Sequence, residues 1–344
     1  MRKLLLALIL GIIMNGCGKK SQKNNLENKS AAATDSSTVN FLPVKDPGQK
    51  FNIEYKFEKG KDYNYRVTFS SEDKQNIKND SSYNKDIMQN TVYLLKTKLK
   101  GYKNDSLLNF ICKITSITFT ANVNGKIFNY QSGAKNDSID TFRYAEYAAL
   151  IDNPFSVTIK KYGGIVNISS VDMIINKYIK LKRMIKRATK PVKVRLKQNI
   201  VDRSLEPLII NIFRKMPKNT IAKDSSWSDE LPPAHFIIFT LNNSNTFKIS
   251  DLNKYHDNLI ASIKVGLKTQ IHGNTTYKAG NAVYNFKKPK TSAKGNIYFN
   301  ISKGCIQKSE IQTEAKVFFT MESPGQKEGS KSENMTSENI VELL

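Results

Sequence analysis

The stretch IQKSEIQTEAKVFFTM, residues 306–321, alternates in polarity along its second half. The odd-numbered residues are mostly apolar, whereas the even-numbered residues between them are mostly polar. The odd-numbered residues are Ile311, Thr313, Ala315, Val317, Phe319 and Met321. A period of two places successive side chains on opposite faces of a β-strand. The stretch therefore predicts a strand with one buried face.

Alternation of the same kind extends through most of the chain after residue 50. Residues 71–86 have no apolar alternation and are predicted to be a polar connection. The phase of alternation slips near Ser116, which predicts a β-bulge. Asn124-Gly125 predicts a tight hairpin turn, and Gly163-Gly164 predicts a turn between two short strands. The predicted strands cover 51–57, 63–69, 87–102, 107–121, 126–130, 155–159, 165–168, 235–241, 244–250, 258–271, 282–288, 295–303, 306–321 and 334–343.

The middle of the chain has helical spacing instead. Residues 140–150 follow an Asp cap, and residues 171–185 place apolar side chains on one helical face. A further helical stretch over 194–214 contains Pro207, which should kink or divide it. We therefore predict a single α+β domain over 49–344. Its large, mostly antiparallel, curved sheet forms an open or half barrel, with two or three helices inserted at about 140–216.

The first residues have the composition of an export signal. Arg2 and Lys3 precede an apolar run from Leu4 to Met14, which is too short to span a membrane that needs about 20 apolar residues. The following Met14-Asn15-Gly16-Cys17 resembles the lipobox of bacterial lipoproteins. It implies a signal peptide over 1–16, lipidation of Cys17 and membrane anchoring. The alternative is an ordinary secretory signal with an incidental cysteine.

Residues 17–48 are rich in Lys, Asn, Ser and Ala, and we expect a flexible tether there. No acidic residue follows Cys17 directly, since the next residues are Gly18-Lys19-Lys20-Ser21. By analogy with known lipoproteins, this favours an outer-membrane lipoprotein facing the periplasm. An exported protein is not expected to bind nucleic acid.

The chain is strongly basic. Lys and Arg number 54 against 30 Asp and Glu, a net charge of +24, and removal of Arg2 and Lys3 with the signal leaves +22. Such a charge favours anionic envelope surfaces as partners. The alternative is that the cations are spread over a solvated surface.

Ten of the 21 residues from 177 to 197 are basic and none is acidic. On an amphipathic helix, these cations could contact anionic lipid headgroups. The alternative is a helix packed on the core with a solvated basic back. The predicted membrane-binding or anion-binding residues are Lys177, Lys180, Lys182, Arg183, Lys186, Arg187 and Lys190.

The sequence contains no motif for catalysis, metal binding or a cofactor. The histidines His235, His256 and His272 lack zinc-site spacing, and neither a nucleophile elbow nor a phosphate-binding loop is present. We therefore expect no enzymatic activity and no cofactor. Cys112 and Cys305 are either two small buried residues or a disulfide, which an oxidising periplasm would allow.

Three segments carry a resemblance to a family of bacterial lipoproteins classed as a domain of unknown function. They are FEKGKDYNYRV (57–67), NPFSVTIKKYGGIVNISSVD (153–172) and GNIYFNISKGCIQKSEI (295–311), and the resemblance covers most of residues 50–321. It implies no catalytic residues. The order of strands and helices is also similar to that of LolA- and LolB-like carriers, whose half barrels hold acyl chains.

These observations lead to two functional hypotheses, and a third alternative is an enzyme without a recognisable motif, which would need a polar cleft with perturbed titratable groups. The first is an anchored envelope lipoprotein that binds or carries an apolar or amphiphilic ligand on a curved sheet. The second is a non-enzymatic lipoprotein that docks on an anionic glycan, lipopolysaccharide or a protein partner.

Overall fold

The computed structural model describes residues 42–44, 48–79, 81–135, 137–325 and 327–344. In chain order, its strands are β1 (Leu42–Pro43), β2 (Asp62–Lys78), β3 (Ser82–Lys103), β4 (Leu107–Val123), β5 (Lys126–Gln131), β6 (Phe155–Lys160), β7 (Ile165–Ser169), β8 (Ser226–Glu230), β9 (Ala234–Phe236), β10 (Phe239–Tyr255), β11 (Asn258–His272), β12 (Thr276–Ala279), β13 (Ala282–Asn300), β14 (Cys305–Glu322) and β15 (Gly329–Leu343).

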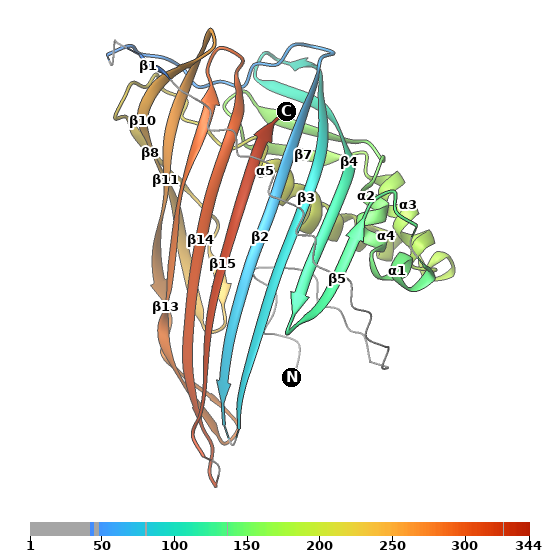
Figure 1. Ribbon diagram of the computed structural model, residues 1–344, viewed down its shortest axis with the longest axis vertical. Helices are drawn as coiled ribbons and strands as arrows, with labels where there is room; N and C mark the ends of the chain where they lie inside the picture. The colour runs from blue at the N-terminus through green and yellow to red at the C-terminus, as the bar shows by residue number, and fades with distance from the viewer. Residues whose placement is uncertain (1–41, 45–47, 80, 136, 326) are drawn as a thin grey trace.

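Within the described residues, these strands form one 15-stranded sheet in the order β1-β10-β11-β13-β14-β15-β2-β3-β4-β6-β7. The shorter β5, β8, β9 and β12 pair with β4, β10, β10 and β13. Each strand pair is antiparallel, and β1 and β7 end the order without pairing with each other (Figure 1). The predicted α+β fold with an open, curved, antiparallel sheet is confirmed.

Several strands are longer than predicted. Residues 71–86 are not a connection, because β2 runs to Lys78 and β3 begins at Ser82. Likewise β13 joins two predicted strands. The strand predicted over 235–241 is divided by a turn at 237–238, and its end joins the strand predicted over 244–250 in β10. The added parts have polar residues on both faces, so apolar alternation does not reveal them. Backbone pairing with long neighbours holds them in the sheet.

Two local predictions about β4 are confirmed. The register of β3 and β4 shifts between Leu94 and Leu95, beside Ser116, as the change in phase predicted. At the end of β4, Asn124 and Gly125 have φ values of 50° and 84°. Positive φ at both central residues of a two-residue loop matches the twist of a hairpin, and β5 follows.

The segment from Phe51 to Phe57 was predicted to be a strand. It is extended, but it does not form a continuous pairing with a neighbouring strand. Phe51, Ile53, Tyr55 and Phe57 are buried and the residues between them are not, so the period-two prediction of burial is correct. Along residues 51–57, one isolated β-bridge forms, between Phe51 and Ile221. Burial of alternate side chains thus does not require a paired strand.

The inserted helical region is divided into more pieces than predicted. Its elements are α1 (Ser138–Arg143), α2 (Ala145–Leu150), α3 (Asp172–Leu181), a 3₁₀ turn (Ile185–Arg187), α4 (Lys190–Ile200), a π turn (Val201–Leu205) and α5 (Glu206–Ile212). The helix expected over 171–185 stops at Leu181, and Arg183 has a φ of 53°. Pro207 lies in the first turn of α5, directly after the π turn, so it divides the helical stretch as predicted.

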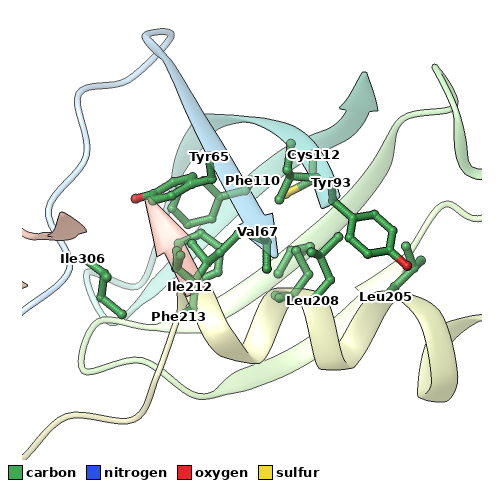
Figure 2. Packing of buried hydrophobic residues seen from close by; sticks show 14 of the residues in the cluster. Tyr65, Val67, Tyr93, Phe110, Cys112, Leu205, Leu208, Ile212, Phe213 and Ile306 are labelled. Carbon is green, nitrogen blue, oxygen red and sulfur yellow. The ribbon is translucent and has the colours of Figure 1, made fainter. Parts of the chain in front are cut away.

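Helix α5 packs on the sheet and closes the core at one end. Figure 2 shows Leu208, Ile212 and Phe213 at α5 directed toward Val67 of β2 and Phe110 of β4. The rings of Phe213 and Phe110 lie 4.9 Å apart, and those of Phe213 and Tyr55 lie 5.7 Å apart. Aromatic pairs at these distances add about 0.5–1.5 kcal/mol each to the burial of their surface.

The sheet begins earlier than the predicted domain boundary at residue 49. Leu42 and Pro43 pair with Lys254 and Asn253 of β10, and the Val44 amide donates to the Leu252 carbonyl at 3.0 Å. These three residues were predicted to belong to the tether. The predicted signal peptide, Cys17 and the rest of the predicted tether up to residue 41 lie outside the described residues.

Candidate functional site

The sheet face that carries the core continues beyond the helices. We call this face the inner face. On β2 it holds Tyr65 and Val67, which are fully buried, and then Phe69, Ser71 and later odd-numbered residues, which are half-buried. Figure 1 shows the far ends of β2, β3, β14 and β15 extending past the helices. We call this part, from Phe69 to Ile77 of β2 and across its neighbours, the distal inner face.

Continuous register identifies the members of the distal inner face. Asp73 of β2 lies opposite Met335 of β15, which lies opposite Ala315 of β14. Ala315 in turn lies opposite Thr291 of β13. Because cross-strand partners share a face, these side chains form one row across the sheet.

Polar side chains on this face form a band that we call the polar belt, and several of them are joined by hydrogen bonds. Thr313 and Ser337 hydroxyls are 2.6 Å apart. Thr291 donates to Thr269 at 2.7 Å, and Thr269 donates to the side-chain oxygen of Asn243 at 2.7 Å. The members of the polar belt are Ser71, Asp73, Gln75, Gln89, Asn243, Thr269, Thr291, Thr313, Glu333 and Ser337.

A carboxylate pair lies within the belt. The Gln75 amide donates to Asp73 at 2.6 Å and to Glu333 at 3.3 Å, and Lys331 pairs with Glu333 at 2.6 Å. One carboxyl oxygen of Asp73 is buried and has no hydrogen-bond partner among the described residues. Burial raises the pKa of Asp73 above its ordinary value, and the nearby charge of Glu333 adds to the rise.

We expect Asp73→Asn to stabilise the protein at neutral pH. A raised pKa means that the folded state binds the proton more tightly than the unfolded state, so the wild type loses stability as pH rises above about 4. Asparagine cannot ionise and so removes this loss. The melting temperature of Asp73→Asn should therefore exceed that of the wild type most at pH 7–8, and the difference should shrink toward pH 4. Thermal melts across this range would test it.

Asp62→Asn is a control of opposite sign. Hydrogen bonds from Lys96 and Lys98 lower the pKa of Asp62. That variant should therefore be less stable than the wild type at neutral pH. A stability difference for Asp73→Asn that does not change with pH would contradict the assignment.

A second apolar cluster lies toward the far end of the inner face and overlaps the polar belt, since its Val317 lies opposite Glu333. Phe286 and Phe319 have ring centres 4.9 Å apart, and Phe239 and Phe286 lie 6.1 Å apart. Leu241 and Val317 are buried nearby in the same rows. We call these five residues the distal cluster. The inner face thus passes from the apolar core to a region in which the polar belt and the apolar distal cluster adjoin.

The predicted basic residues do not form one continuous helical face. Lys177 donates to the Ile151 carbonyl at 3.1 Å. Lys182 donates to the Phe142 carbonyl at 2.7 Å and lies 4.1 Å above the Phe142 ring. These two cations hold neighbouring helical segments, whereas the other five predicted residues are exposed: Lys180, Arg183, Lys186, Arg187 and Lys190.

The exposed cations continue into α4. We call residues 180–197 the basic corner; it also contains Lys193, Arg195 and Lys197, all exposed. Two apolar side chains project from it, Ile185 at 70% exposure and Val194 at 61%. Exposed apolar side chains among cations are typical of surfaces that contact membranes.

The two cysteines are free, buried thiols, so the alternative of a disulfide is not realised. Cys112 is on β4 and Cys305 begins β14, with β3, β2 and β15 between these strands in the sheet. Burial raises the pKa of Cys305 to about 12 and that of Cys112 further. Both thiols are therefore protonated near neutral pH and pack as small apolar groups.

No cluster of three or more His, Cys, Asp or Glu is arranged to hold a metal ion among the described residues. Nor does any helix among these residues combine the length and hydropathy required to cross a membrane.

Sequence reasoning missed the polar belt. Asp73 and Gln75 fall in the predicted connection, and the other members come from strands far apart in sequence. The one available signal was weak: runs of Ser, Thr and Asn at alternate positions, such as Asn243 and Asn245, next to apolar alternation.

Comparisons with solved structures give weak likenesses. Lipovitellin, from a study of its lipid–protein interactions, matches 84% of this chain at 12% identity and a TM-score of 0.39, and the chain spans 25% of it. The Pseudomonas aeruginosa protein OccK2 (OpdF) matches at 6% identity and a TM-score of 0.20, over 81% of this chain and 98% of its own. An outer membrane channel from Pseudomonas putida F1 matches at 8% identity and a TM-score of 0.17. The match covers 87% of this chain and 99% of the channel. Likenesses at such low TM-scores carry no functional meaning.

No curated protein matches the sequence significantly. A family model does match, over residues 105–306, and its description is "Family of unknown function (DUF6263)". The matched region runs from just before β4 to the start of β14, and so includes the helical insertion and much of the sheet. Because the match covers more than half of the chain, the protein belongs to the DUF6263 family.

Proposed function

We propose that this protein is an envelope lipoprotein, anchored through acyl groups on Cys17, that binds an amphiphilic ligand on the distal inner face. The observation that carries the proposal is the half-burial of mixed apolar and polar side chains on a part of the sheet that extends past the helices. The core end of the same face is filled by α5, so the distal part is the portion left for a ligand.

The chemistry of this face favours an amphiphile over a purely apolar ligand. Apolar side chains such as Ile87, Leu267 and Met335 are half-buried, and covering their remaining surface would contribute about 25 cal/mol per Å². The polar belt lies among them. An apolar ligand would displace water from the hydroxyls and amides of the belt without offering them hydrogen bonds. Each group left unpaired would cost about 1–3 kcal/mol of binding free energy. A ligand with both an acyl chain and a polar head avoids this cost.

The basic corner supports a second candidate, docking of the anchored protein on an anionic envelope surface. Its eight exposed cations have no acidic neighbour in the segment, and each could contribute about 1 kcal/mol near an anionic membrane. Ile185 and Val194 would add burial in the headgroup region. This candidate requires no ligand on the inner face.

Mass spectrometry of the full chain, purified from the envelope in mild detergent, tests the anchor and the ligand separately. Under denaturing conditions, we expect the mass of a chain beginning at Cys17 with covalent acyl groups. Under native conditions, we expect a further non-covalent mass of lipid size. A mature chain without acyl mass would reject the anchor.

The ligand arm has its own negative outcome. Equal native and denatured masses, unchanged after incubation with envelope lipids, would reject the ligand. If that protein also co-sediments with anionic vesicles in a salt-sensitive way, the docking candidate replaces the first. Vesicles of neutral lipid serve as the control, because they keep the acyl anchor and remove the electrostatic attraction.

A further inference from the structure

A groove of about 470 Å³ lies over β8, β10 and β11. Its polar lining residues face away from the core, since the residues of opposite parity, Phe247 and Val265, belong to the buried core. It is therefore on the outer face of the sheet, opposite the surface proposed above. Volumes of about 300–1,000 Å³ are typical of sites for small molecules.

A glycine interrupts the row of side chains on the outer face within the groove. Thr246 of β10 lies opposite Ser228 of β8 on one side and opposite Gly266 of β11 on the other. Gly266 has no side chain to fill its place in this row. A Cβ there would come within 2.8 Å of the Thr246 hydroxyl oxygen, so the threonine leans over the gap.

Three lysines surround the gap. Lys264 and Lys268 flank Gly266 on the same face of β11, and Lys248 lies opposite Lys264. Lys248 pairs with Asp224 at 2.8 Å, whereas Lys264 and Lys268 make no ion pair with any described residue. Lys264 and Lys268 are thus available to bind an anion, and Lys248 is a third cation beside them.

Hydroxyl groups complete the lining. Ser226 lies opposite Lys248 in the next row, and Ser228 and Thr246 lie across the centre. Each hydroxyl can donate one hydrogen bond and accept others. Lysines supply charge for a phosphate, and hydroxyls can bond both phosphate and sugar oxygens.

We propose that this outer groove binds a phosphorylated sugar. The phosphate would lie between Lys264 and Lys268 above Gly266, and the sugar hydroxyls would contact Ser226, Ser228 and Thr246. The volume accommodates a monosaccharide together with its phosphate. The site does not depend on the inner-face ligand.

Trp227, the single tryptophan, is not a direct reporter for this site. It lies opposite Phe247 and stacks on it with ring centres 5.2 Å apart, so its ring is on the core face of the sheet. Binding is therefore measured by calorimetry, and titration of the full chain with glucose 6-phosphate should show saturable binding. Inorganic phosphate should bind more weakly and glucose should give no saturable change.

Variants locate the response. Lys264→Gln should raise the dissociation constant for glucose 6-phosphate at least fivefold, and Gly266→Val should abolish binding by filling the gap. Lys316→Gln, an exposed lysine on the outer face of β14, should bind as the wild type does. Thermal melts should accompany each variant, and Lys264→Gln, which places no new bulk, is decisive if Gly266→Val does not fold.

Two results would overturn the proposal. One is the absence of any saturable response to glucose 6-phosphate. The other is an unchanged dissociation constant in Lys264→Gln, which would place the ligand elsewhere. Vesicles that carry a glycolipid with a phosphorylated sugar headgroup form a separate arm. If the protein binds these vesicles more tightly than the free sugar phosphate, and Lys264→Gln loses that binding, the phosphorylated sugar belongs to a lipid. If the two bind equally, the ligand is a free sugar phosphate.

Discussion

Gly163→Ala is expected to lower the free energy of unfolding by about 3 kcal/mol or more. Gly163 has a φ of 78°, which L-residues adopt only at a cost. A Cβ at this position would lie 2.0 Å from the Arg214 carbonyl oxygen and 2.9 Å from the Tyr55 ring. The segment that follows α5 would have to move away from the turn between β6 and β7.

The next residue provides a matched control. Gly164 has a φ of 82°, and a Cβ there would meet nothing within 4 Å. Gly164→Ala therefore measures the conformational cost alone, about 1–2 kcal/mol. Urea unfolding of both variants should show Gly163→Ala to be less stable by at least about 2 kcal/mol, the cost of the overlap.

Equal stabilities would contradict the packing of α5. The contact links the turn to the aromatic core, because the Tyr55 hydroxyl also donates to the Arg214 carbonyl at 3.0 Å. The Gly164 amide donates to the Phe213 carbonyl at 3.2 Å. If Gly163→Ala costs no more than Gly164→Ala, the chain after α5 is not held against this turn.

This turn also illustrates what the sequence can predict. The glycine pair marked a turn correctly, because positive φ is a local property. The contact with Arg214 was not predictable, because it joins residues about 50 positions apart through tertiary packing. Local features such as the Asn124-Gly125 hairpin and the bulge beside Ser116 were predicted for the same reason that the turn was.

The distal parts of the strands were missed for a different reason. Apolar alternation identifies a strand only where one face is buried among apolar groups. From Ser71 to Gln75 the inner face carries polar side chains, so the pattern disappears while the backbone pairing continues. The prediction of a connection over 71–86 was wrong for this reason, and it concealed part of the candidate site.

The outer groove depends on cross-strand neighbours. Ser228, Thr246 and Gly266 share a row only because β8, β10 and β11 pair in one register. A shift of one residue in any of these pairs would turn their side chains to opposite faces. Spacing along the chain does not contain this information.

Binding of the ligand at the distal inner face is tested by substitution of Ala315. Ala315 is a small residue on the inner face of β14, between Met335 and Thr291. Ala315→Phe adds a ring to the proposed binding surface. Lys316→Phe adds the same ring to the outer face, one residue away.

The measurement is the fraction of chains that carry non-covalent lipid mass under native conditions, with thermal melts to establish that both variants fold. We predict at least a tenfold lower fraction for Ala315→Phe than for the wild type, and no change for Lys316→Phe. Folded Ala315→Phe protein that retains the wild-type fraction would contradict binding at the distal inner face.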